Sequence, residues 1–186
     1  MKRDQRLIQS ENAIIEAGIR TLLANPSAGM SEIAKAAKVG RATLYRHFDS
    51  REALIQKIAV ICLQEINDAT ESFGHLNGRD TIEAIIEVVM PLANRFSFLN
   101  SLWDIAADDE VVKSIAQQQF DEMSAIVEEA KTLGQMDAVL PTVWIVALFE
   151  GVLAAAWELM EAGSISSDEA VQYAKRSFFN GCAQHS

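Results

Sequence analysis

The chain has 186 residues, of which 49% are hydrophobic, and its formal net charge at pH 7 is −10. This length is sufficient to bury a hydrophobic core in one domain or in two small ones. Only three prolines and nine glycines occur, and the abundant Ala, Leu, Ile, Glu and Gln favour helix, so the composition argues against a β-rich or low-complexity protein.

The charge is divided unevenly along the chain. Residues 1–61 contain ten Lys or Arg and six Asp or Glu, whereas the remaining residues contain six Lys or Arg and twenty Asp or Glu. The first third therefore has a net charge of +4 and the remainder −14. An acidic protein with this distribution can still bind a polyanion through its N-terminal part.

The N-terminal segment MKRDQRLIQS is charged and has no apolar stretch of the signal-peptide kind, so we expect a cytoplasmic protein. Apolar residues then recur with helical spacing from about Arg6 to Ala24. The segment NPSAG ends this helix, because proline disfavours helix in the residue before it. Two short helices are predicted next, at about 30–37 and 41–47, with a tight turn at 38–40 between them.

A longer helix is predicted from about residue 50 to 73. Asp49 can cap its first turn, and Glu52, three residues later, can reach back to the same turn. The three preceding helices, the last two joined by a tight turn, are typical of a helix-turn-helix unit. We place a helix-turn-helix domain at residues 1–50 and a helical domain at residues 51–186.

The small core of this unit is expected to contain Ile33, Val39, Leu44 and Phe48. Five residues of the second short helix then face outward: Arg41, Ala42, Thr43, Tyr45 and Arg46. Arginine can pair with guanine in a major groove, and Thr or Ala can contact a thymine methyl group. The pattern alone leaves open a solvated helical hairpin whose charges are incidental.

The run IAKAAKVGRATLYRHFDSREAL, residues 33–54, resembles the DNA-binding segment of the tetracycline-repressor (TetR) family of bacterial transcription regulators. The matching elements are Ile33-Ala34, Thr43-Leu44-Tyr45, His47-Phe48 and Arg51-Glu52 before Leu54. The motif covers about a third of the chain. The resemblance implies an all-α fold of about nine helices, with an N-terminal three-helix DNA-binding domain and a C-terminal helical ligand-binding and dimerisation bundle.

The resemblance also implies residue roles. The start of the recognition helix would meet base edges or backbone, and Tyr45, His47 and Arg51 would bind phosphates, although His47 beside Phe48 could instead pack. The DNA-binding candidates are Ser31, Lys38, Arg41, Ala42, Thr43, Tyr45, Arg46, His47 and Arg51. Two positions depart from the family pattern, with Lys38 where glycine is usual and Gly29 where a threonine cap is frequent.

The acidic remainder is predicted to be helical as well. After the break GHLNGR at 74–79, helices are expected at about 80–96, 109–133, 141–161 and 167–182, with a short helix inside 96–108. The apolar segment 139–160 contains Glu150 at its middle, and a carboxylate at mid-bilayer costs about 2.5 kcal/mol or more. We therefore predict a buried core helix there and no membrane partner.

Small residues recur at four-residue spacing in the last two helices. The resemblance implies that these helices pair with their copies in a homodimer, and the alternative is that the strips pack only within one subunit. The dimer-interface candidates are Ala147, Gly151, Ala155, Ala170, Ala174 and Phe178.

Large apolar side chains in the middle helices suit either a plain core or an irregular ligand cavity. The resemblance implies an unknown small-molecule effector in this region. The candidate ligand-binding residues are Met90, Phe96, Leu99, Trp103, Phe120, Met123, Trp144 and Leu148. Asp104 and Glu150 lie in apolar runs, and each either faces solvent or is paired inside.

Enzymatic signatures are lacking in the sequence. The three histidines have no metal-ligand spacing, and there is no glycine-rich phosphate loop and no nucleophile elbow. Cys62 and Cys182 have no metal or redox spacing either, so we expect reduced thiols, no metal, no cofactor and no catalytic residue.

The expected function is that of a sequence-specific DNA-binding transcriptional regulator. The resemblance implies a repressor that a small hydrophobic or amphipathic ligand releases from a near-palindromic double-stranded operator. The alternative is a non-enzymatic helical protein-interaction bundle whose helix-turn-helix is only structural.

Overall fold

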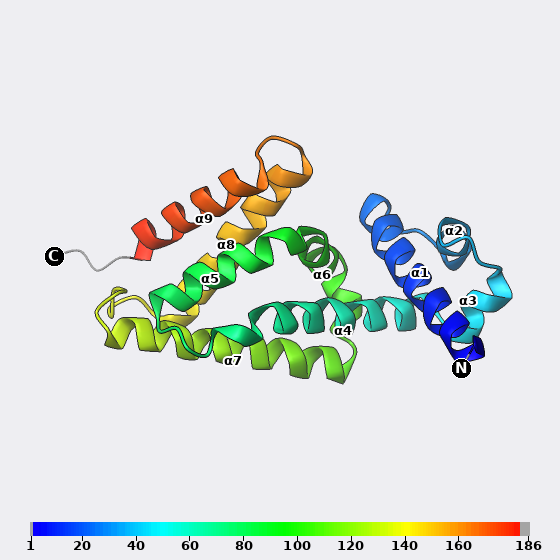
Figure 1. Ribbon diagram of the computed structural model, residues 1–186, viewed down its shortest axis with the longest axis horizontal. Coiled ribbons are helices and arrows are strands. Elements are labelled where there is room, and N and C mark those ends of the chain that lie inside the picture. Colours follow the sequence, from blue (N-terminus) through cyan, green and yellow to red (C-terminus); the bar gives the residue numbers. More distant parts are fainter. Residues whose placement is uncertain (1, 183–186) are drawn as a thin grey trace. The chain divides into compact units, whose positions relative to one another are not determined.

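The computed structural model describes residues 2–182, with side chains from residue 9 onward, and its regular structure over that range is helical (Figure 1). The prediction of an all-α fold is confirmed. The helices are α1 (Lys2–Ala24), α2 (Met30–Ala36), α3 (Arg41–His47), α4 (Arg51–Thr70), α5 (Arg79–Val89), α6 (Ala93–Ala106), α7 (Glu110–Thr132), α8 (Thr142–Glu161) and α9 (Ser167–Cys182), with 3₁₀ turns at Glu71–Phe73 and Met90–Leu92.

The chain forms two compact units. The first contains the residues up to 63 together with 94–113, and the second contains 64–93 and the residues from 114 onward. Helix α4 is therefore divided between the units at Leu63. The domain boundary expected at residue 50 falls inside the first unit.

In the first unit, α1 packs against α2, and α2 packs against α3. Ile14, Ile19 and Leu22 of α1 are fully buried. A Cβ atom at Gly18 would lie 2.8 Å from Cδ1 of Ile58, so the absence of a side chain there allows α1 and α4 to approach closely. The N-terminal helix is thereby seated directly on the first part of α4.

Helix α6 joins the same unit through an ion pair. Nη2 of Arg95 lies 2.6 Å from Oε1 of Glu16 in α1, and the Arg95 side chain is only 13% exposed. The helix is bent at Leu102, whose φ of −126° and ψ of 17° are not helical. Thus a segment from the middle of the sequence is fastened to the N-terminal helix.

The helix expected at 80–96 is wrong in its extent. Helix α5 ends at Val89, a 3₁₀ turn follows over Met90–Leu92, and α6 begins at Ala93. Pro91 lies at the centre of that turn. Because proline lacks a backbone N–H and its ring clashes with the preceding turn, a continuous α-helix through this position is disfavoured.

In the second unit, α8 and α9 pack side by side (Figure 1). The rings of Phe149 and Phe178 meet edge to face with centroids 5.5 Å apart. Helix α9 also contacts α5, where the Arg79 guanidinium lies 4.2 Å from the centre of the Phe179 ring and Nζ of Lys175 lies 2.6 Å from Oε1 of Glu87. Both aromatic packing and charge pairing hold α9 in place.

Helix α8 is buried on one face only, so the expectation of a buried core helix is wrong for its other face. The inward face consists of Ile145, Val146, Phe149, Leu153, Ala156 and Trp157. By length and composition α8 could cross a membrane, but only 33% of its apolar stretch is buried within the chain. High mean hydropathy does not show which side chains of a helix are buried within one subunit and which stay exposed.

Candidate nucleic-acid interface

The turn between α2 and α3 is built around a left-handed residue. Lys38 has a φ of +56°, and it is the residue at which the sequence departs from glycine. The N–H of Val39 donates to the carbonyl of Ala34 at 3.0 Å, which closes the end of α2. A side chain in this conformation costs up to about 1 kcal/mol relative to glycine.

Helix α3 begins immediately after this turn. Gly40 has an extended conformation, and its carbonyl accepts hydrogen bonds from the N–H groups of Thr43 at 2.9 Å and Leu44 at 3.1 Å. Of the four predicted core residues, Leu44 and Ile33 are fully buried and Phe48 is 6% exposed, whereas Val39 is only half-buried. This core determines which face of α3 is directed outward.

The outward face of α3 presents Arg41, Ala42, Tyr45 and Arg46, which we call the recognition face. Tyr45 is 51% exposed. Thr43 is half-buried beside them, and its Oγ1 accepts a hydrogen bond from Nη2 of Arg46 at 3.0 Å. Two guanidinium groups, a phenol and a methyl group thus lie on one side of a short helix. Side chains of these types can contact phosphates and base edges.

Positive charge surrounds the recognition face. Residues 30–48 contain four Lys or Arg, all exposed, and a single acidic residue, Glu32. The Glu32 carboxylate accepts a hydrogen bond from the N–H of Gly29 at 3.0 Å, so it caps the start of α2. It compensates in part for the missing cap at Gly29, which has no side chain. The cations therefore dominate this surface.

His47 and Ser31 occupy different environments. Nε2 of His47 lies 2.7 Å from Oγ of Ser10, so α3 is hydrogen-bonded to α1 at this residue. The imidazole centroid is 6.1 Å from that of Phe48, and the side chain is half-buried. Ser31 is exposed in the first turn of α2. One nitrogen of His47 is thus used within the protein.

Arg51 begins α4, and its guanidinium points to the loop between α1 and α2. Nε donates to the carbonyl of Ala28 at 2.9 Å, and Nη2 donates to the carbonyl of Pro26. The sequence motif suggested a phosphate contact at this position. No sequence signal indicated the loop carbonyls, because any residue type can supply a backbone carbonyl.

The candidate ligand-binding residues are distributed over both units. Phe96, Leu99 and Trp103 belong to the first unit, and Met90, Phe120, Met123, Trp144 and Leu148 belong to the second. Met90 and Leu99 are buried, whereas Trp103, Phe120 and Trp144 are 38%, 36% and 60% exposed. Asp104 and Glu150 are also exposed. The buried members therefore contribute to the core of their own units.

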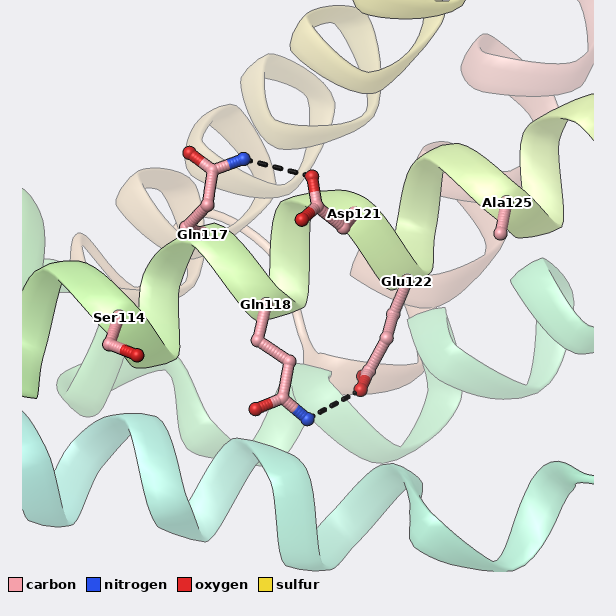
Figure 2. Close-up of a pocket in the computed structure, with 6 residues that line it drawn as sticks. All are labelled: Ser114, Gln117, Gln118, Asp121, Glu122 and Ala125. Atoms are coloured by element: carbon pink, nitrogen blue, oxygen red, sulfur yellow. Dashed lines mark hydrogen bonds between the residues drawn. The ribbon is translucent and has the colours of Figure 1, made fainter.

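An open groove of about 580 Å³ follows α7 in the second unit (Figure 2). It is lined by Ser114, Gln117, Gln118, Asp121, Glu122 and Ala125, which the sequence analysis did not select. Nε2 of Gln117 donates to Oδ1 of Asp121 at 2.8 Å, and Nε2 of Gln118 donates to Oε1 of Glu122 at 2.8 Å. These i,i+4 pairs are visible in the sequence, but they ordinarily mark a solvated helix face.

The dimer-interface candidates divide by helix. Ala147, Gly151 and Ala155 are exposed on α8, and we call them the α8 strip. Ala170, Ala174 and Phe178 of α9 are at most 2% exposed, because they pack within the subunit. Of the six candidates, the three of the α8 strip are the exposed ones.

No cluster of three or more metal-ligating side chains occurs among the residues whose side chains are described. Cys62 and Cys182 are both buried as free thiols. Burial raises the pKa of Cys182, which lowers its reactivity.

Comparison with known proteins identifies the N-terminal region. The family model for bacterial regulatory proteins of the tetR family matches residues 14–58. A segment of 28 residues is 79% identical to an uncharacterised HTH-type transcriptional regulator of Mycobacterium tuberculosis, strain CDC 1551 / Oshkosh. That segment covers 15% of this chain and only 14% of the relative.

Similarity to solved structures extends over nearly the whole chain. A TetR family transcription regulator from Marinobacter aquaeolei VT8 has a TM-score of 0.79 at 18% identity, covering 98% of this chain and all of the other. The TetR-like regulator LfrR of Mycobacterium smegmatis, in complex with proflavine, has a TM-score of 0.74 at 24% identity, covering 96% and 99%. At these identities the likeness establishes the fold.

Proposed function

We propose that this chain is a TetR-family regulator, because the family model for bacterial regulatory proteins of the tetR family matches its residues 14–58. We further propose that it is a non-enzymatic transcriptional repressor of the cytoplasm. It binds a near-palindromic double-stranded DNA operator as a homodimer. A small hydrophobic or amphipathic molecule releases it from the operator. The effector acts through the helices that follow the helix-turn-helix.

The recognition face carries this proposal. Arg41 and Arg46 project from a helix whose opposite side is fixed by the buried Leu44, so the two guanidinium groups are held on one rigid surface. A short helix of this kind can enter the major groove, where arginine pairs with guanine. The exposed Lys35 and Lys38 beside it supply attraction to phosphates.

A homodimer supplies the second recognition helix. The α8 strip lies on the exposed apolar side of α8, where small residues allow another helix to approach. A twofold-symmetric pair presents its recognition helices to half-sites about 34–36 Å apart, one turn of DNA. The operator is therefore expected to be an inverted repeat.

Effector binding and DNA binding oppose each other in this scheme. The structural relative LfrR was solved in complex with proflavine, which supports the proposal that this chain also takes a small organic molecule. Thermodynamic linkage requires that an effector which weakens DNA binding is itself bound less tightly by the DNA complex. If a tightly bound ligand leaves DNA affinity unchanged, the effector part of the proposal fails.

Selection from a random double-stranded DNA pool tests the DNA-binding part. The intact protein and the variant Arg20→Ala, which removes an exposed arginine of α1, should enrich the same near-palindromic site. Arg41→Ala should lose that enrichment, because it removes a guanidinium from the recognition face. If the wild-type protein enriches no sequence at low or moderate salt, the protein-interaction alternative is favoured instead.

A further inference from the structure

The loop at residues 25–29 contains two hydrogen bonds of its own, both accepted by Asn25. The N–H of Ala28 donates to the carbonyl of Asn25 at 2.9 Å, and the N–H of Ser27 donates to Oδ1 of Asn25 at 3.1 Å. The Ala28 methyl group is fully buried. This turn leaves the carbonyls of Pro26 and Ala28 available to a donor from another part of the chain.

Arg51 supplies that donor. Its Nε binds the carbonyl of Ala28 at 2.9 Å, its Nη2 binds the carbonyl of Pro26, and its Nη1 lies 4.0 Å from Oε1 of Glu52. Each of the three guanidinium nitrogens therefore has a partner within the protein, and the side chain is only 20% exposed. The planar fork of arginine matches two acceptors at once, which a lysine ammonium group cannot reproduce.

The position of the loop gives this clamp a functional consequence. Ala28 precedes Gly29, the N-cap of α2, and α2 is followed by the turn that begins α3. Arg51 is the first residue of α4. The clamp thus joins the start of α4 to the start of α2, so it contributes to the orientation of the helix pair that bears the recognition face.

We propose that Arg51 is a positioning residue that fixes the α1–α2 loop, and that it is not a phosphate ligand. The proposal rests on the DNA-binding function proposed above. For Arg51 to reach a phosphate, the guanidinium would have to leave both loop carbonyls. The adjacent Glu52 carboxylate also offsets part of its charge.

The salt dependence of operator binding separates the two roles. We compare the wild-type protein, Arg51→Lys, Arg51→Gln and the control Lys57→Gln, which removes one charge from an exposed site on the same helix. Positioning predicts that both Arg51 variants lose about tenfold or more in affinity, because the charged hydrogen bonds are lost in each. It also predicts an unchanged slope of log K against log salt, with Lys57→Gln close to wild type.

A phosphate contact predicts a different pattern. Arg51→Lys would then keep an affinity near that of wild type, and Arg51→Gln would make the slope shallower by about 0.9, the contribution of one neutralised phosphate. That pattern would overturn the proposal. Arg51→Lys retains the charge and the aliphatic stem, so it keeps the comparison informative if Arg51→Gln does not fold.

Hydrogen exchange in the absence of DNA provides an independent readout. The amide of Ala28 is bonded to Asn25, and it should exchange faster in Arg51→Lys than in wild type or in Lys57→Gln. Unchanged protection of residues 28–30 in Arg51→Lys would overturn the proposal. Because this measurement needs no DNA, its result does not depend on whether the wild-type protein selects an operator.

Discussion

At the scale of single residues, the turn before the recognition helix combines two conflicting demands at Lys38. Its positive φ favours glycine, whereas a lysine adds a cation to the exposed basic surface that contains Arg41, which suits the proposed contact with DNA phosphates. The resemblance to the TetR DNA-binding segment indicated this position, because glycine is usual there. Compared with glycine, lysine at this position lowers the folding stability and adds a positive charge.

Replacement of Lys38 by glycine should separate these effects. We expect Lys38→Gly to increase the free energy of unfolding by up to about 1 kcal/mol, because glycine adopts a positive φ without steric cost. Operator affinity should nevertheless fall with the loss of the charge. Chemical denaturation and DNA titration at fixed salt measure the two quantities.

Lys38→Ala is the matched control, since it removes the charge and keeps a Cβ atom. It should weaken DNA binding as Lys38→Gly does, without the gain in stability. An equal gain in both variants would show that the lysine side chain, and not its backbone conformation, lowers the stability of the wild-type protein.

The clamp at Arg51 could not be predicted in the same way. The motif identified the residue and its place at the start of α4, but its partners are two backbone carbonyls on a loop more than twenty residues earlier. Carbonyls are common to every residue and leave no trace in a sequence pattern. Only the folded arrangement shows what the guanidinium binds.

At the scale of helices, the spacing of apolar residues and the positions of helix-breaking proline and glycine residues located most of the elements. Helices α3 and α9 have the predicted bounds, 41–47 and 167–182. The failure at 80–96 arose where apolar periodicity was given more weight than Pro91, although proline alone is sufficient to interrupt an α-helix. The two-sided character of α8 was missed because both of its faces are apolar.

Glu150 on α8 makes the stability of the protein depend on pH. Although Glu150 is exposed as a whole residue, the neighbouring protein atoms partly desolvate its carboxyl group and raise its pKa above the ordinary value of 4.5. The folded state therefore holds the proton at a higher pH than the unfolded state does, and the folded state loses stability as the pH rises through that interval. The loss begins as the pH rises above the pKa of the unfolded state and is complete once the pH exceeds the pKa of the folded state.

Glu150→Gln should consequently raise the melting temperature most at the alkaline end of the pH range, because the amide carries no charge to desolvate. The difference from wild type should shrink as the pH falls and should disappear below 4.5, where the carboxyl group is protonated in both states. Glu158→Gln, at an exposed site of the same helix, should leave the melting temperature unchanged throughout. A gain from Glu150→Gln that is independent of pH would contradict this account.

At the scale of the whole molecule, the charge distribution and the exposed α8 strip both favour the proposed homodimer. The N-terminal part is positive and the rest is strongly negative, so the proposed contact with DNA is favoured on the N-terminal part. One such region per subunit provides a small contact. Two copies joined through α8 would double it and would add the requirement for a second half-site.

Ala147→Glu tests this arrangement by placing a carboxylate in the α8 strip. We expect the variant to sediment as a monomer and to lose about a hundredfold or more in affinity for a near-palindromic site, since the second half-site no longer contributes as a linked contact. Ala125→Glu, at an exposed position on α7, should remain dimeric and bind as wild type. A dimeric Ala147→Glu protein would place the interface elsewhere.

The division of the chain into discontinuous units has a consequence for protein engineering. Arg95 is paired with Glu16, and Gly18 lies against Ile58. The unit that contains the helix-turn-helix therefore draws on residues up to 63 and on 94–113. A chimera that exchanges only the first fifty residues with those of a relative would inherit mismatched partners at both contacts. A graft intended to redirect operator choice should therefore transplant both stretches, or confine its changes to the recognition face.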